Sequence, residues 1–185
     1  MILMMFKKLW NFYKIPLLIS LTLAIVLISI KVEKQVLGIT LIVLGSLIGT
    51  FFLDLDYFIW AFFLEPASDF SKTLAGYTRH ADFMNIVNHI YYHKNDLREK
   101  TLNSVFFQIV LAGMSVIVVS STHFNLIKAF VLSIFANSIY RMFECYFEGR
   151  TDEWFWALKN KPKRNGVIMY GMVLLVVLIF SVRLF

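Results

Sequence analysis

Apolar residues occur in this sequence in long runs separated by polar segments, and the length of the runs predicts helices that cross a lipid bilayer. The runs cover about residues 15–30, 36–56, 104–121, 125–147 and 167–184. A helix needs about 20 predominantly apolar residues to cross the hydrocarbon core, which is roughly 30 Å thick. The pattern therefore predicts an all-α, polytopic helical membrane protein with about five transmembrane helices, folded as a single membrane domain over residues 1–185.

The longest polar segment, residues 65–103, separates the second run from the third. Within it, apolar side chains recur at helical spacing, at Phe83, Ile86, Val87, Ile90 and Tyr91. This spacing puts them on one helix face, so it predicts an interfacial amphipathic helix over about residues 80–94. His89 and His93, four residues apart, could contribute to a zinc site. No motif supplies further ligands, and the favoured interpretation is a pair that faces solvent or lipid headgroups.

Composition and charge support the membrane assignment. Hydrophobic residues make up 59% of the chain, too many for a soluble domain of 185 residues to bury. The net charge is +6, but the basic residues flank the apolar runs instead of gathering in one soluble domain. This distribution excludes nucleic acid as an expected partner. It favours the lipid bilayer and its anionic headgroups as partners, with a further membrane protein as a possible one.

The basic residues also predict the orientation. With the N-terminus in the cytoplasm, thirteen lysines and arginines fall on the cytoplasmic side and four on the outside. Short cytoplasmic segments of membrane proteins are enriched in these residues. We therefore predict a plasma (inner) membrane protein with a cytoplasmic N-terminus, a cytoplasmic insertion over residues 65–103, and the C-terminus outside.

Candidate chemistry lies where the second run ends. Gly45 and Gly49 form a small-residue pair that allows another helix to approach closely, and Asp54 and Asp56 follow. On a regular helix Asp56 lies near the glycine face, whereas Asp54 points about 200° away from it. The two carboxylates can therefore meet at one centre only if the backbone breaks between Leu53 and Asp56.

The third and fourth runs carry polar residues at the same predicted membrane depth as Asp54 and Asp56. Asn137, Arg141 and Glu144 form one stripe of the fourth helix, and Asn103 precedes the third. Ionisable residues inside a membrane normally face a partner or a cavity. The favoured interpretation is an ion pair of Arg141 with one aspartate, preferably Asp56, in a structural cluster with the three polar residues Asn103, Asn137 and Glu144. A metal or phosphate site and an ion or proton pathway are the alternatives.

The motif G-x-x-x-G-x-x-x-x-D-x-D, over Gly45 to Asp56, resembles the opening motif of the LexA-regulated, membrane-bound metal-dependent hydrolase family. In that family the motif typically reads G-A-L-L-G-A-L-L-P-D-L-D-H, so Leu53 replaces its proline and Tyr57 its histidine. A later element, R-x-x-T-H-S, is similar to Arg98–Ser104, with Asn103 in the histidine position. A third, H-x-x-x-D, would fall on Asn137 and Arg141.

The resemblance implies a multi-helix inner-membrane protein and, if activity were retained, a divalent metal held by Asp54 and Asp56 with Arg141 beside it. The missing histidines and the arginine in an aspartate position imply a degenerate member instead. Two functions follow as hypotheses. The first is a non-catalytic interaction or scaffold protein derived from a hydrolase-like ancestor. The second is a metal-dependent hydrolase of a phosphate or lipid-like substrate, with Asp54, Asp56 and Arg141 as catalytic residues.

Overall fold

The computed structural model describes residues 2–93 and 100–185, with side chains described from Tyr13 onward. Within these ranges every regular element is helical, which confirms the predicted all-α class. The elements are α1 (Ile2–Lys31), α2 (Val36–Phe52), α3 (Leu55–Ile59), the π-helical turn η1 (Trp60–Leu64), α4 (Asp69–Arg79), α5 (Phe83–His93), α6 (Val105–Ser121), α7 (Asn125–Phe147), α8 (Thr151–Trp154) and α9 (Arg164–Arg183).

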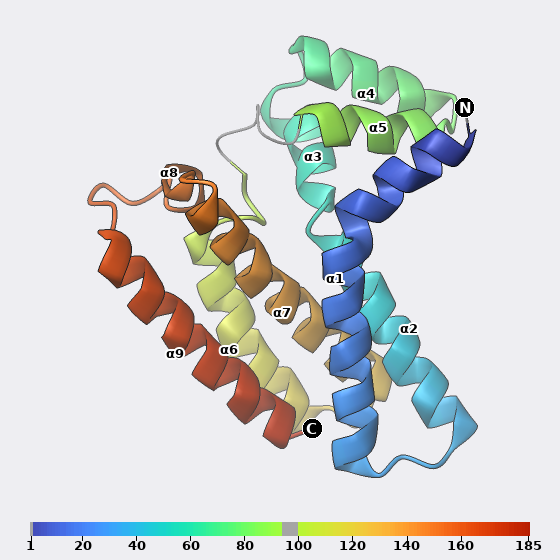
Figure 1. Ribbon diagram of the computed structural model, residues 1–185, viewed down its shortest axis with the longest axis vertical. Helices are drawn as coiled ribbons and strands as arrows, with labels where there is room; N and C mark the ends of the chain where they lie inside the picture. Colours follow the sequence, from blue (N-terminus) through green and yellow to red (C-terminus); the bar gives the residue numbers. More distant parts are fainter. Residues whose placement is uncertain (1, 94–99) are drawn as a thin grey trace.

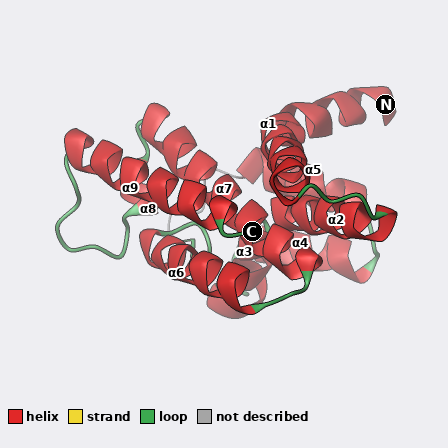
Figure 2. Ribbon diagram, turned by 90° about the horizontal axis from the view of Figure 1, so that it is seen from below, coloured by secondary structure: helices red, strands yellow, loops and turns green. Residues whose placement is uncertain are grey.

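The long helix α7 lies at the centre of the bundle. In both views α1 and α2 lie on one side of it and α6 and α9 on the other (Figures 1 and 2). Contacts with all four neighbours bury α7 along most of its length, from Ala129 to Met142. This explains why an apolar helix without a marked polar face is stable here: the four neighbouring helices cover most of its surface.

The two ends of the bundle differ. The start of α1, the α3–α5 region and α8 lie at one end, and the α1–α2 link, the α6–α7 link and the C-terminus lie at the other (Figure 1). We call the first the helical-hairpin end. The described parts of the segments that are predicted to be cytoplasmic thus share one end of the molecule, and the orientation itself stays a prediction.

Three helices of the described residues are long and apolar enough to cross a membrane, namely α1 from Tyr13 to Lys31, α7 and α9. A fourth candidate is formed by α2 and the segment of α3 and η1 that follows it. These two parts meet at a bend of 43°. The third predicted span, residues 104–121, is the one that remains; it corresponds to α6, which has 17 residues. At about 1.5 Å per residue it is roughly 26 Å long, shorter than the ~30 Å core. The described chain therefore gives three to four candidate spans, fewer than the predicted five.

The second predicted span, residues 36–56, is interrupted. Helix α2 ends at Phe52, and α3 begins at Leu55 after a turn. The backbone therefore does break between Leu53 and Asp56, although no proline stands at position 53. The reason is tertiary: Asp56 bonds the backbone amides of Thr101 and Asn103, and these contacts hold the bent geometry.

The polar insertion folds into a helical hairpin of α4 and α5, of which the sequence indicated only the second helix. Ser68 caps α4 by accepting a hydrogen bond from the Ser71 amide at 3.2 Å. Ile86 and Ile90 of α5 are buried in one cluster with Leu74 of α4. The apolar face of α5 thus packs mainly against its own chain. Residues 94–99 of the insertion lie outside the described residues.

Candidate functional site

The glycine pair of α2 lies directly against α7. A Cβ atom added to Gly45 would lie 2.3 Å from the carbonyl oxygen of Leu126, and one added to Gly49 would lie 2.8 Å from that of Phe130. The predicted close approach of a second helix is therefore confirmed, and the partner is α7. This contact brings the end of α2 to the level of Arg141.

Asp54, just beyond α2, forms the ion pair with α7. Its Oδ1 accepts a hydrogen bond from Arg141 Nη2 at 2.7 Å, and its Oδ2 accepts one from the Tyr13 hydroxyl at 2.8 Å. The side chains of Arg141 and Asp54 are only 12% and 9% exposed, so little water screens the pair. The preference for Asp56 as the partner of Arg141 is wrong, because the bend at Leu53 turns Asp54 toward α7.

Asp56 has a different set of partners. Its Oδ1 accepts from the Thr101 amide, and its Oδ2 accepts from the amide of Asn103 and from Asn103 Nδ2, each at 2.9 Å. The side chain is buried, with 1% exposure. Three N–H donors stabilise its charge, and they fix the chain that enters α6.

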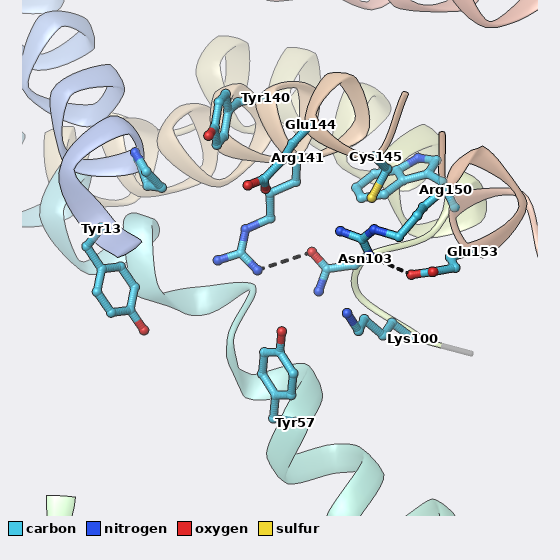
Figure 3. Close-up of a pocket in the computed structure, with 12 residues that line it drawn as sticks. Tyr13, Tyr57, Lys100, Asn103, Tyr140, Arg141, Glu144, Cys145, Arg150 and Glu153 are labelled. Carbon is cyan, nitrogen blue, oxygen red and sulfur yellow. Dashed lines mark hydrogen bonds and ion pairs between the residues drawn. The ribbon is translucent and has the colours of Figure 1, made fainter. Parts of the chain in front are cut away.

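Asn103 joins the two aspartates into one network. Its Oδ1 accepts from Arg141 Nη1 at 3.3 Å, while its Nδ2 also donates to the carbonyl of Leu53 at 3.1 Å. Figure 3 shows its side chain between Arg141 and the segment that carries Arg150 and Glu153. The chain of contacts runs Tyr13–Asp54–Arg141–Asn103–Asp56, so the carboxylates are connected through other groups and do not converge on one centre.

A divalent metal does not fit this arrangement. Both oxygens of Asp54 and both of Asp56 accept hydrogen bonds from the chain, and the guanidinium of Arg141 stands where a cation would bind. In the described ranges, 2–93 and 100–185, no three histidine, cysteine, aspartate or glutamate side chains are grouped to hold a metal. Metal ligation by Asp54 and Asp56 would require the Arg141 pair to open first.

The histidine pair of α5 packs against α4. His89 Nε2 lies 3.1 Å from the carbonyl oxygen of Phe70, and the two rings stack with centroids 4.7 Å apart. The His93 ring lies 4.6 Å from that of His89. Partial burial lowers the pKa of His89. These contacts give His89 a packing role in the hairpin.

Asn137 belongs to a second, deeper network that the sequence analysis missed. Its Nδ2 donates to Ser20 Oγ of α1 at 2.9 Å, and Ser20 Oγ lies within hydrogen-bond distance of Thr50 Oγ1 (2.7 Å) and Ser133 Oγ (2.9 Å). Ser133 in turn donates to the carbonyl of Ser46 at 2.6 Å. All five side chains are fully buried. The only signal in the sequence is the presence of small polar residues in otherwise apolar runs, which commonly join membrane helices.

A cavity of about 60 Å³ lies beside Arg141 at the helical-hairpin end. It is walled by α1, α3, α7 and the segments around residues 100 and 150 (Figure 3). Lys100 Nζ lies 5.3 Å from the centre of the Tyr57 ring, and burial lowers the pKa of Lys100. Glu144, predicted in the cluster, lines this cavity next to Arg141.

On the far wall of the cavity, Arg150 is already paired. It forms ion pairs with Glu153 at 2.7 Å and with Glu148. Trp154, which also lines the cavity, is buried and donates from Nε1 to Gln108 Oε1 of α6 at 3.1 Å. This wall therefore anchors α8 to the bundle.

No protein-family model, curated protein or solved structure matches this chain.

Proposed function

We propose that this chain is a multi-pass membrane protein with a non-catalytic interaction or scaffold role, in which the network around Arg141 is structural. One observation carries the proposal: every carboxylate oxygen of Asp54 and Asp56 accepts a hydrogen bond from the chain itself. A hydrolytic metal centre uses such oxygens as ligands and keeps a position open for substrate or water. Here the same atoms join α1, the end of α2, the segment before α6, and α7.

The proposed placement has five helices in the plasma membrane, with the N-terminus in the cytoplasm. In support of it, α6 is flanked by polar caps at Ser104 and Thr122 and has an apolar length of 17 residues. A shortfall of a few ångströms against the bilayer costs only fractions of a kcal/mol per Å, through local thinning. The basic residues at the helical-hairpin end would contact anionic headgroups, and a membrane-protein partner would complete the scaffold.

The alternative is a metal-dependent hydrolase acting on a phosphate or lipid-like substrate. The motif of Gly45 to Asp56 and the cavity beside Arg141 favour it. The kinship with the metal-dependent hydrolase family stays a prediction. If it is real, the ion pair of Asp54 and Arg141 replaces the ancestral metal ligation.

Metal content and mutational rescue distinguish the two functions. We would purify the full chain in mild detergent and measure bound divalent metals in the wild type, Asp54→Asn and Asp56→Asn. Asp69→Asn is the matched control, because the Asp69 side chain is fully exposed. Stoichiometric metal that disappears with Asp54→Asn or Asp56→Asn, but not with Asp69→Asn, would overturn the scaffold proposal.

The rescue tests the ion pair directly. Asp54→Asn leaves the buried guanidinium of Arg141 without its carboxylate, and breaking a buried pair in this way typically costs about 3–5 kcal/mol. Adding Arg141→Met removes the uncompensated charge, so the double variant is expected to be more stable than Asp54→Asn alone. Equal or lower stability of the double variant would contradict a structural ion pair.

A further inference from the structure

A second cleft lies beside α8, where α7 ends and α9 begins (Figure 1). Its volume is about 390 Å³, and its lining includes Tyr146 and Phe147 of α7, Thr151 of α8, and Arg164 and Val167 of α9. We call it the α7–α9 cleft. None of these residues belongs to the network around Arg141, so the cleft is a separate feature of the molecule.

Arg164 is the only charged residue in the lining of the α7–α9 cleft. Its Nε donates to the Tyr146 hydroxyl at 2.6 Å, and its guanidinium lies 5.7 Å from the centre of the Tyr146 ring. Both contacts are with a neutral side chain, so they hold the guanidinium at the cleft without neutralising its charge. Within residues 2–93 and 100–185, no carboxylate pairs with Arg164, and its two Nη groups have no hydrogen-bond partner.

The acidic residues of the neighbouring segment are already paired. Arg150 forms ion pairs with Glu148 and Glu153, and Lys161 Nζ lies 3.2 Å from Asp152 Oδ1. None of these three carboxylates lines the α7–α9 cleft. A cationic group of a ligand would therefore find no carboxylate there, whereas an anionic group would find a guanidinium.

The Thr151 hydroxyl gives the cleft a second donor. Thr151 is half-buried at the start of α8, and in the described part of the chain its hydroxyl makes no hydrogen bond. The planar fork of an arginine with a hydroxyl beside it suits the oxygens of a phosphate group. The volume of about 390 Å³ is within the roughly 300–1,000 Å³ typical of small-molecule sites, so it accommodates a phosphate together with the glycerol that carries it.

The apolar part of the lining favours a phosphate carried by a lipid over a free phosphate ion. Phe147 at the rim of the cleft is 81% exposed, and Val167 inside it is 1% exposed. Arg164 is the first residue of α9, one of the candidate spans, so the proposed placement puts the cleft at the level of the headgroups. From there the exposed side chains of Ile168 and Met169 continue along α9. A lipid could bind with its phosphate in the cleft and its acyl chains along this apolar surface.

We propose that the α7–α9 cleft binds the phosphate of an anionic phospholipid whose headgroup carries no amine, of the phosphatidylglycerol class. The Nη groups of Arg164 and the hydroxyl of Thr151 donate to the phosphate oxygens, and the glycerol contacts Phe147. The inference rests on the proposed membrane placement and names the lipid partner at this end of the molecule.

The test is native mass spectrometry of the full chain in mild detergent with added phosphatidylglycerol or phosphatidylcholine of identical acyl chains. The wild type is expected to retain phosphatidylglycerol about tenfold more tightly, because the choline group finds no carboxylate in the cleft and lies near a guanidinium. Equal retention of the two lipids would overturn the proposal. Displacement of phosphatidylglycerol by an equimolar amount of inorganic phosphate would also overturn it, since the site would then be one for the free anion.

Variants assign the preference to the cleft. Arg164→Met and Arg164→Gln are both expected to abolish the preference for phosphatidylglycerol, and the glutamine can still bond the Tyr146 hydroxyl, which preserves the link between α7 and α9. Thr151→Val, nearly identical in shape, is expected to weaken the retention of phosphatidylglycerol about fivefold. A preference that survives both Arg164 substitutions would refute the assignment.

Lys159→Met is the matched control, because Lys159 is an exposed cation of the same loop that does not line the cleft. If this substitution lowers the preference as much as Arg164→Met does, general positive charge attracts the lipid and the proposed site is refuted. All of these variants keep the Asp54–Arg141 pair. A negative result would therefore overturn the lipid site alone, and the rescue experiment remains a separate test of the scaffold proposal.

Discussion

The glycine contact between α2 and α7 allows the most direct test of the fold. Gly45→Ala places a methyl group 2.3 Å from the backbone carbonyl oxygen of Leu126, and the next nearest atoms, at 3.1 Å, are also backbone. Ordinary van der Waals contact begins at 3.4 Å. Because no flexible side chain can move aside, the two helices must separate locally by about 1 Å.

That separation sets the size of the loss that we expect in the free energy of unfolding. A gap of about 1 Å forfeits up to half of each van der Waals contact across it, and overpacking of this kind costs about 1–3 kcal/mol. It also stretches the 2.6 Å hydrogen bond from Ser133 to the Ser46 carbonyl, worth about 1 kcal/mol. The intrinsic helix preference of alanine over glycine returns up to about 1 kcal/mol. The net expected loss is about 1–3 kcal/mol in the free energy of unfolding.

The assay is unfolding in mixed micelles by increasing the fraction of sodium dodecyl sulfate, followed by far-ultraviolet circular dichroism. Gly113→Ala in α6 is the matched control, because an added Cβ there meets no atom within 4 Å. It should leave stability unchanged or slightly raised. If Gly45→Ala is as stable as Gly113→Ala, the close packing of α2 on α7 is refuted.

Three further predictions concern other contacts. Asn103→Ala removes the bridge between Arg141 and Asp56, so it should lower the free energy of unfolding by about 2–3 kcal/mol in the same assay. A loss in the free energy of unfolding smaller than that of an exposed Asn→Ala variant would contradict the network. Trp154→Phe deprives the buried Gln108 Oε1 of its donor and should cost about 1–3 kcal/mol, measured by the same unfolding, with Trp156→Phe as the more exposed comparison. Because burial lowers the pKa of His89 from its ordinary value of 6.5, the hairpin should be fully stable above about pH 6.5 and lose stability as the pH falls below it. Hydrogen exchange of the α4 amides tests this, and a His89→Gln variant that keeps the same pH dependence would refute the assignment to His89.

The sequence by itself predicted the elements whose physics is local. Helix α7 covers Asn125–Phe147, the residues of the fourth apolar run, because a backbone in an apolar environment must bond within its own helix. The glycine spacing predicted a close helix contact, since the absence of a side chain is itself a local property. Arg141, charged within an apolar run, predicted a carboxylate partner because an unpaired charge is costly there.

Only the tertiary structure decided which groups meet. Asp54 rather than Asp56 pairs with Arg141 because a turn held by Thr101 and Asn103 redirects the chain after α2. Asn137 bonds Ser20 of α1, a residue far away in the sequence that nothing in the hydrophobic pattern distinguishes. Helix α4 was missed because its polar sequence becomes a stable helix through the packing of Leu74 on α5. Periodicity reports which face of a segment is apolar, whereas hydrogen-bond partners depend on which segments the fold brings together.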